Sequence, residues 1–261
     1  MSLRTVRAVR YIQPLREGGS LPLLAETDDG KKFVVKMRGA GQGALALTAE
    51  ILGGEMARAL GLRVPEIVLV ELDAAFGRNE PDAEIQDLFK RSTGLNVGLE
   101  FLPGATVFDP AAGDVADADE ASCTVWLDAF LLNIDRTAKN ANLLMFEKQM
   151  WLIDQGAALY FHHNWPTAME KASLPFAPIR DHILLRWASE MPAAGAAARD
   201  VLTETKVREI VALVPGLLLH AEGDEASDDE RRAAYVEFFL TRLAHAAVFE
   251  EEVAHARAEV L

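Results

Sequence analysis

Three residues of one stretch, Asp135, Asn140 and Asp154, have side chains suited to binding a metal ion and accepting a proton. Asp135 and Asn140 lie in a polar loop after an apolar run, and Asp154 begins a D-x-G turn after another apolar run. In kinase chemistry a loop aspartate accepts the proton of the attacking hydroxyl. An asparagine five positions later binds Mg²⁺, as does the aspartate of a D-x-G turn. The spacing predicts Mg-ATP-dependent phosphoryl transfer, with Asp135 as the base and Asn140 and Asp154 as metal ligands. The alternative is an Asn/Asp-rich turn without chemistry between a core helix and a hairpin.

Residues 3–36 should supply the phosphate-binding side of such a site. They read as strands separated by Gly/Asp turns, and the glycine-rich turn contains Gly18, Gly19 and Ser20. A kinase places the backbone amides of such a turn over the nucleotide phosphates. The last strand ends in Val34-Val35-Lys36, which is similar to the V-A-I-K strand that presents a phosphate-binding lysine. We therefore expect Gly18, Gly19, Ser20 and Lys36 to contact ATP.

A helix should follow from Ala44, because apolar residues recur there at helical spacing until Gly61 and Pro65 end the pattern. Glu50 lies about one turn into this helix, where a kinase carries the glutamate that pairs with the strand lysine. Glu55 is the rival candidate for that pairing, and either side chain could instead lie on a solvated face. We predict that Glu50 holds Lys36.

The fold class predicted from this order of elements is α+β, a two-lobed kinase-like fold. Residues 1–102 would form a β-rich N-lobe that ends in a strand at 96–102, with an interlobe hinge whose backbone meets the adenine at Glu100, Phe101 and Leu102. Residues 103–261 would form a helical C-lobe that carries the catalytic loop. Helices are expected at about 180–190, 203–214 and 228–257, the last one starting at a capping box of Ser227 and Glu230.

Composition excludes several classes of function. A formal net charge of −14 over 261 residues argues against direct binding of nucleic acid, which depends on Lys and Arg. A single cysteine, Cys123, excludes an internal disulfide framework. No apolar run approaches the ~18 residues of a membrane span, and Arg4, Arg7 and Arg10 are not followed by the apolar segment of a signal peptide. We expect a cytoplasmic protein without membrane contact.

The segments "NIDRTAKNANLL" and "LIDQGAALYFHH" resemble the HipA-like kinases, in which Arg follows the catalytic Asp, as Arg136 follows Asp135 here. HipA-like sequences also carry a glutamate at the place of Glu50. The resemblance implies ATP:protein phosphotransfer onto Ser or Thr by a compact form without the N-terminal domain of toxin-type relatives. It also implies that phosphorylation of the glycine turn, at Ser20, could switch the enzyme off.

The identity of the phosphate acceptor stays open at this stage. The chain has no Ala-Pro-Glu sequence of the kind that ends a protein-kinase activation segment. A small-molecule kinase, acting on a cationic substrate such as an aminoglycoside, is therefore an alternative to a protein kinase. A kinase-shaped module that binds nucleotide or a partner with little turnover is another.

Overall fold

The computed structural model describes residues 2–15, 21–41, 43–78 and 80–261. Its N-terminal strands are β1 (Thr5–Pro14), β2 (Leu23–Thr27), β3 (Lys32–Lys36), β4 (Ile67–Leu72) and β5 (Gly94–Glu100). They form a closed barrel in the order β1-β2-β3-β5-β4, in which β1 and β4 pair in parallel and the other neighbours are antiparallel. Closure leaves none of these strands with an unpaired edge.

Alternation along the strands places one set of side chains inside the barrel. Phe33 and Val35 of β3 and Val68 and Val70 of β4 are fully buried there. At Gly98 of β5, an added Cβ would come within 2.6 Å of the Val70 side chain and 3.2 Å of Phe33. The glycine therefore makes room for the larger side chains at the centre of the barrel.

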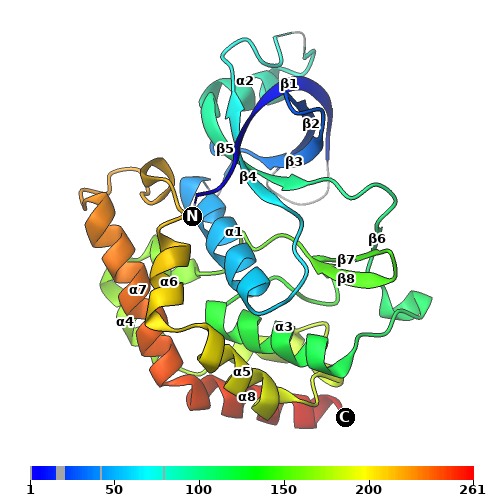
Figure 1. Ribbon diagram of the computed structural model, residues 1–261, viewed down its shortest axis with the longest axis vertical. Coiled ribbons are helices and arrows are strands. Elements are labelled where there is room, and N and C mark those ends of the chain that lie inside the picture. Colours follow the sequence, from blue (N-terminus) through cyan, green and yellow to red (C-terminus); the bar gives the residue numbers. More distant parts are fainter. Residues whose placement is uncertain (1, 16–20, 42, 79) are drawn as a thin grey trace.

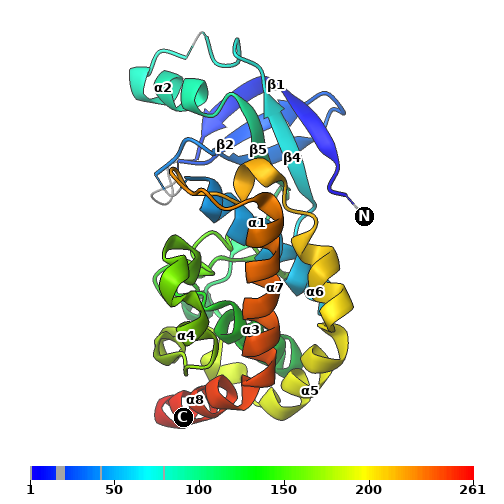
Figure 2. The same cartoon turned by 90° about the vertical axis from the view of Figure 1, so that its left-hand side faces the viewer.

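The views show the barrel at one end of the molecule, helices α3–α8 at the other, and α1 between them (Figures 1 and 2). The helices are α1 (Gly43–Ala59), α2 (Ala83–Arg91), α3 (Ala118–Leu131), α4 (Ala168–Ala172), α5 (Met191–Val201), α6 (Glu204–Val211), α7 (Asp228–Ala244) and α8 (Ala246–Val260). Strands β6 (Thr106–Val107), β7 (Leu143–Phe146) and β8 (Gln149–Leu152) form a second sheet in that order. In the part of the chain that the structure describes, no helix combines the length and apolar character of a membrane span.

The central helix of the second half is α3, which is buried along nearly its whole length. Trp126 stacks on Phe130 within this helix, and both rings contact Phe249 of α8. A helix that is apolar on all sides is stable only when other elements surround it. Here α1, α5 and α8 pack against it, so α3 anchors the polar loop that follows its C-terminal end.

The mixture of strands and helices expected from the sequence is confirmed, but several boundaries were wrong. Residues 228–257 do not form one helix, because the chain breaks at His245 and α8 turns so that Phe249 packs on Trp126. Residues 180–190 are not a regular helix. The backbone of residues 182–183 instead pairs with residues 136–137, and short 3₁₀ turns flank that pairing. The last barrel strand is 94–100 rather than 96–102.

Arg242 of α7 joins several helix ends inside the core. Its side chain is almost fully buried and donates to the backbone carbonyls of Ala129, Phe130 and Leu174 at 2.8, 3.3 and 2.6 Å. Burial lowers the pKa of this guanidinium to about 10, and its cation lies over the Phe249 ring. The carbonyl end of α3 is the negative end of the helix dipole, which favours a cation there.

We predict that Arg242→Met lowers the free energy of unfolding by roughly 2–4 kcal/mol, because buried carbonyls lose their donors. Arg208→Met is the matched control. Arg208 is mostly exposed and pairs with Glu204 one turn away, so its replacement should change stability by less than about 0.5 kcal/mol. Urea unfolding followed by circular dichroism measures both, and equal effects would show that the Arg242 contacts contribute nothing specific.

Candidate active site

Lys36, Glu50 and Asp154 come together from three distant parts of the chain. Lys36 ends β3, Glu50 lies in the second turn of α1, and Asp154 follows β8. The Lys36 Nζ is 2.6 Å from Oε2 of Glu50 and 2.5 Å from Oδ1 of Asp154. The structure thus contains the ion pair predicted between Lys36 and Glu50. The rival, Glu55, pairs instead with Arg58 one turn along α1.

Burial and charge compete within this cluster. Burial disfavours the charged form of Lys36, but the two carboxylates outweigh it and raise the pKa of the ammonium. Burial likewise opposes ionisation of Asp154, yet the Lys36 charge and hydrogen bond and the Gly156 N–H lower the pKa of that carboxyl. Lys36 and Asp154 are therefore both charged at neutral pH. Burial raises the pKa of Glu50 despite the Lys36 charge.

Asp154 has a positive φ of 55°. A non-glycine residue rarely adopts this left-handed conformation, and such strain gathers at functional sites. The Lys36 contact and the links made by Gln155, the next residue, hold the turn in place. The backbone N–H of Gln155 donates to Oε2 of Glu50 at 2.9 Å, so the D-x-G turn contacts the same carboxylate as Lys36.

Asp135 and Asn140 lie in the loop between α3 and β7. Oδ2 of Asp135 accepts hydrogen bonds from the Nδ2 of Asn140 at 2.8 Å and of Asn142 at 3.2 Å. The Asn140 amide nitrogen faces Asp135, and its Oδ1 takes no part in that contact. The Asp135 backbone N–H donates to Oδ1 of Asn133 at 3.1 Å. Asp135 is half-buried and Asn140 is exposed.

Arg136 is a buried cation in the polar loop, and the sequence analysis predicted no chemical role for it. Its side chain and that of Asp128 on α3 are both fully buried, with Nε 2.5 Å from Oδ2 of Asp128. Its NH2 donates to Oε1 of Gln155 at 3.1 Å, and its NH1 donates to the carbonyls of Asn142 and Ile153. This guanidinium links the loop of Asp135 to the turn of Asp154.

His182 completes the buried group around Asp128. Its Nδ1 accepts the Leu184 N–H at 3.1 Å, so the ring proton lies on Nε2, 2.8 Å from Oδ2 of Asp128. Burial opposes ionisation of Asp128, but the Arg136 charge and the His182 hydrogen bond lower its pKa to about 2. Burial lowers the pKa of His182 below its ordinary value, so the ring stays neutral. No spacing in the sequence signals this contact, since residues 128 and 182 are 54 positions apart.

The donors present suit a magnesium ion that arrives with a nucleotide. Carboxylate and amide oxygens are ligands that Mg²⁺ prefers, usually one or two from protein together with phosphate oxygens. Asp154 and Asn140 supply such oxygens. Among the described residues no group of three or more His, Cys, Asp or Glu side chains could hold a metal by itself. The carboxylate of Asp154 and the amide oxygen of Asn140 are each of the donor kind that Mg²⁺ takes alongside phosphate oxygens.

The remaining predicted nucleotide contacts are the glycine-rich turn and the hinge. Gly18, Gly19 and Ser20 lie outside the described residues. Glu100 ends β5, and its side chain pairs with Lys31 at 3.0 Å. The Phe101 N–H donates to the Lys32 carbonyl at 2.9 Å, and the Leu102 carbonyl accepts the Ala105 N–H at 3.2 Å. An adenine contact at Phe101 would therefore involve its carbonyl rather than its amide.

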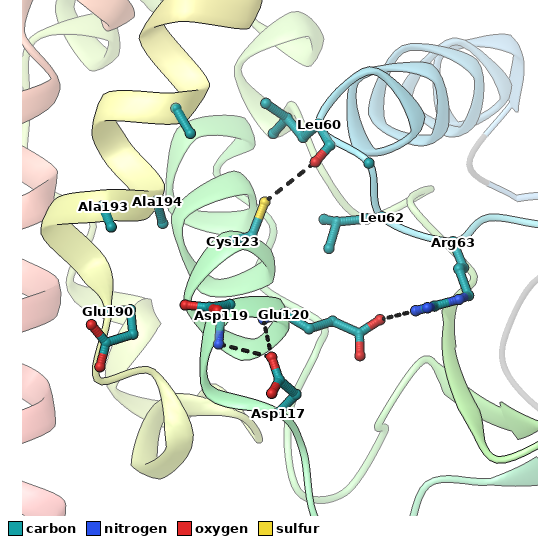
Figure 3. A pocket seen from close by; sticks show the side chains of 12 residues that line it. Leu60, Leu62, Arg63, Asp117, Asp119, Glu120, Cys123, Glu190, Ala193 and Ala194 are labelled. Atoms are coloured by element: carbon teal, nitrogen blue, oxygen red, sulfur yellow. Dashed lines mark hydrogen bonds and ion pairs between the residues drawn. The ribbon is translucent and has the colours of Figure 1, made fainter.

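Two cavities differ in their relation to this cluster. A small one of about 30 Å³ includes Lys36, Gly43, Asp154 and Gly156 in its lining. A larger one of about 530 Å³ lies between the C-terminal end of α1 and the N-terminal ends of α3 and α5 (Figure 3). Its walls include Glu120 and Cys123, whose thiol pKa burial raises to about 11. None of the predicted site residues that the structure describes lines the larger cavity, so its size does not make it the reaction site.

Comparison with known proteins identifies the family. A sequence model described as HipA-like kinase matches residues 8–251. No curated protein sequence matches the chain. The structure is similar to the crystal structure of a Helicobacter pylori proinflammatory kinase, CtkA, with a TM-score of 0.54 and 13% identity over 97% of each chain. At that identity the likeness shows a shared fold, while the family match spans nearly all of the sequence. This chain belongs to the HipA-like kinase family.

Proposed function

We propose that this protein is a Mg-ATP-dependent phosphotransferase that phosphorylates Ser or Thr of a protein. The observation that carries the proposal is the contact of Lys36 with both Glu50 and Asp154, which lie 14 and 118 residues away in the sequence. Phosphoryl transfer is largely a matter of positioning and charge stabilisation, and this cluster supplies both. Residues 1–102 and 103–261 would form the two lobes, joined at Glu100, Phe101 and Leu102.

On the nucleotide side, Lys36 would contact the α- and β-phosphates while Glu50 holds it in place. Backbone amides of Gly18, Gly19 and Ser20 would cover the phosphates. A volume of about 30 Å³ beside Lys36 is far below the ~300 Å³ or more of usual ligand pockets. Binding of ATP would therefore separate Lys36 from Asp154 and widen the space between them.

On the acceptor side, Asp154 and Asn140 would hold Mg²⁺, which when bound neutralises charge on the phosphates. Asp135 would accept the proton of the acceptor hydroxyl. The amides of Asn140 and Asn142 orient its carboxylate through Oδ2. Positioning of this kind would let Asp135 act on a bound hydroxyl without further change in the loop.

The proposal is tested by incubating the chain with radiolabelled ATP and Mg²⁺ in the presence of protein acceptors and, separately, of cationic small molecules. We expect label on Ser or Thr of protein. Label only on a small cation such as an aminoglycoside would replace the protein kinase with a small-molecule kinase. ATP binding without any label on acceptor or enzyme would identify a binding module instead.

We predict that Lys36→Met lowers ATP turnover or ATP affinity at least tenfold, which corresponds to about 1.4 kcal/mol. The reason is the loss of the ammonium that lies between Glu50 and Asp154. Lys90→Met, at an exposed position on α2, is the control and should leave both quantities unchanged. Parent-like kinetics in Lys36→Met would remove this lysine from the site.

We predict that substitutions of Asp135 and Asp154 affect ATP binding and turnover differently. Asp135→Asn is expected to retain Mg-ATP binding by calorimetry while turnover falls by about 10²- to 10⁴-fold, because only the base is lost. Asp154→Asn should lose Mg²⁺-dependent binding as well as turnover, because a metal-holding charge is removed. If both variants bind and turn over ATP like the parent, the loop and turn are structural and the assignment of both residues is wrong.

A further inference from the structure

Gln155, the middle residue of the D-x-G turn, contacts both sides of the candidate site. It is 1% exposed. Its backbone N–H donates to Glu50 on α1, and its side-chain Oε1 accepts from Arg136 in the loop of Asp135. Asn133 also points its Nδ2 toward this oxygen, at 3.5 Å. A single residue next to Asp154 therefore joins the Lys36–Glu50 pair to the polar loop.

Arg136 contacts the neighbours of Asp154 on both sides. Its NH1 lies 3.3 Å from the carbonyl of Ile153, which precedes Asp154, and its NH2 lies 3.1 Å from Oε1 of Gln155, which follows it. Asp135 is the residue immediately before Arg136. A planar guanidinium holds several partners in a fixed geometry, and its Asp128 counter-ion is itself buried on α3. The same cation thus contacts both residues that flank Asp154 and directly follows Asp135 in the chain.

Helix α1 is shaped to receive the Gln155 side chain. A Cβ added at Gly53 would meet Gln155 Cβ at 2.9 Å and Cγ at 3.1 Å. Gly53 lies three positions after Glu50, on the neighbouring turn of the helix. The glycine lets the stem of Gln155 lie directly on α1. A glycine in a helix interior costs about 1 kcal/mol relative to alanine. The close contact with Gln155 explains why a glycine stands at position 53.

We propose that Gln155 and Arg136 are positioning residues that pin the D-x-G turn in one conformation and fix Asp154 relative to Asp135 and Glu50. A rearranged turn would withdraw the Gln155 acceptor and the Ile153 carbonyl from a buried guanidinium. Leaving buried guanidinium donors without acceptors is expensive, so the turn resists rearrangement even without nucleotide. The effect of this pinning on catalysis rests on the proposed function, whereas the pinning itself does not.

Gln155→Met tests the proposal with little change in shape. Methionine fills a similar volume and keeps the backbone N–H, but it removes the acceptor for Arg136. It also removes the Gln155 Nε2, a buried atom without a hydrogen-bond partner in the described part of the chain. The two effects on stability oppose each other, so the melting temperature should stay within about 5 °C of the parent. Gln149→Met, an exposed position on β8, is the matched control.

Two readouts are needed. The first is amide hydrogen exchange of peptides covering 152–158. It should become at least tenfold faster in Gln155→Met and stay unchanged in α3 and α8. The second is ATP turnover as a function of Mg²⁺ concentration. Turnover should fall at least tenfold, with a higher half-saturating Mg²⁺ concentration. Gln149→Met should match the parent in both. A network that only supported the fold would change exchange throughout the molecule and leave the Mg²⁺ dependence of the folded enzyme unaltered.

The outcomes separate the proposal from the proposed function. Parent-like exchange at 152–158 in Gln155→Met overturns the pinning. Faster exchange with unchanged turnover and Mg²⁺ dependence overturns the positioning role. If the parent itself shows no turnover, the proposed function fails and the exchange measurement alone decides the pinning. If Gln155→Met does not fold, Gly53→Ala provides the same test, because the added methyl displaces the Gln155 stem while alanine favours the helix.

Discussion

The structure depends on burying one ammonium group between two carboxylates. Lys36 lies on the barrel, Glu50 on the helix beside it, and Asp154 on the turn after the second sheet, so the ion cluster ties three separate elements to one point. Removing Lys36 would leave the buried Glu50 without its counter-ion, which costs several kcal/mol. Removing either carboxylate would leave Lys36 with a single partner. The positions of the barrel, α1 and the D-x-G turn are thus coupled by electrostatics as well as by packing.

A second buried charge extends this coupling into the helical half. Arg136 and Asp128 neutralise each other beneath the polar loop, and His182 and Gln155 satisfy their remaining hydrogen-bonding groups. Gln155 then reaches the first cluster through Glu50. Each buried charged group in these two clusters has a hydrogen-bonded partner of opposite charge. Buried polar networks are stable when their members are satisfied in this way. The same contacts place residues that sequence spacing alone assigns to phosphoryl transfer.

The sequence was informative where chemistry is encoded locally. Short segments of a few residues are enough to show two features of the site. These are the five-residue spacing of Asp135 and Asn140, and the position of Lys36 at the end of a strand. Closure of the barrel was not predictable in this way, because the parallel pairing of β1 with β4 joins segments about 60 residues apart. The contact of Asp128 with His182 is equally remote in sequence. Arg136 and Gln155 stand next to the predicted site residues Asp135 and Asp154 in the sequence, but their contacts with Asp128 and Glu50 form only in the folded chain.

Charge also constrains how a nucleotide could enter. Lys36 and Asp154 carry opposite charges and the pKa of Glu50 is raised, so the cluster offers no net positive charge to a bare phosphate. When Lys36 leaves Asp154 for a phosphate, Asp154 would lose its counter-ion unless a divalent cation accompanies the nucleotide. When metal and nucleotide bind together, Lys36 would pair with a phosphate and Asp154 with the metal ion, so neither charge would be left unpaired. Under the proposed function, the ion pair between Lys36 and Asp154 therefore favours joint binding of Mg²⁺ and ATP over binding of either alone.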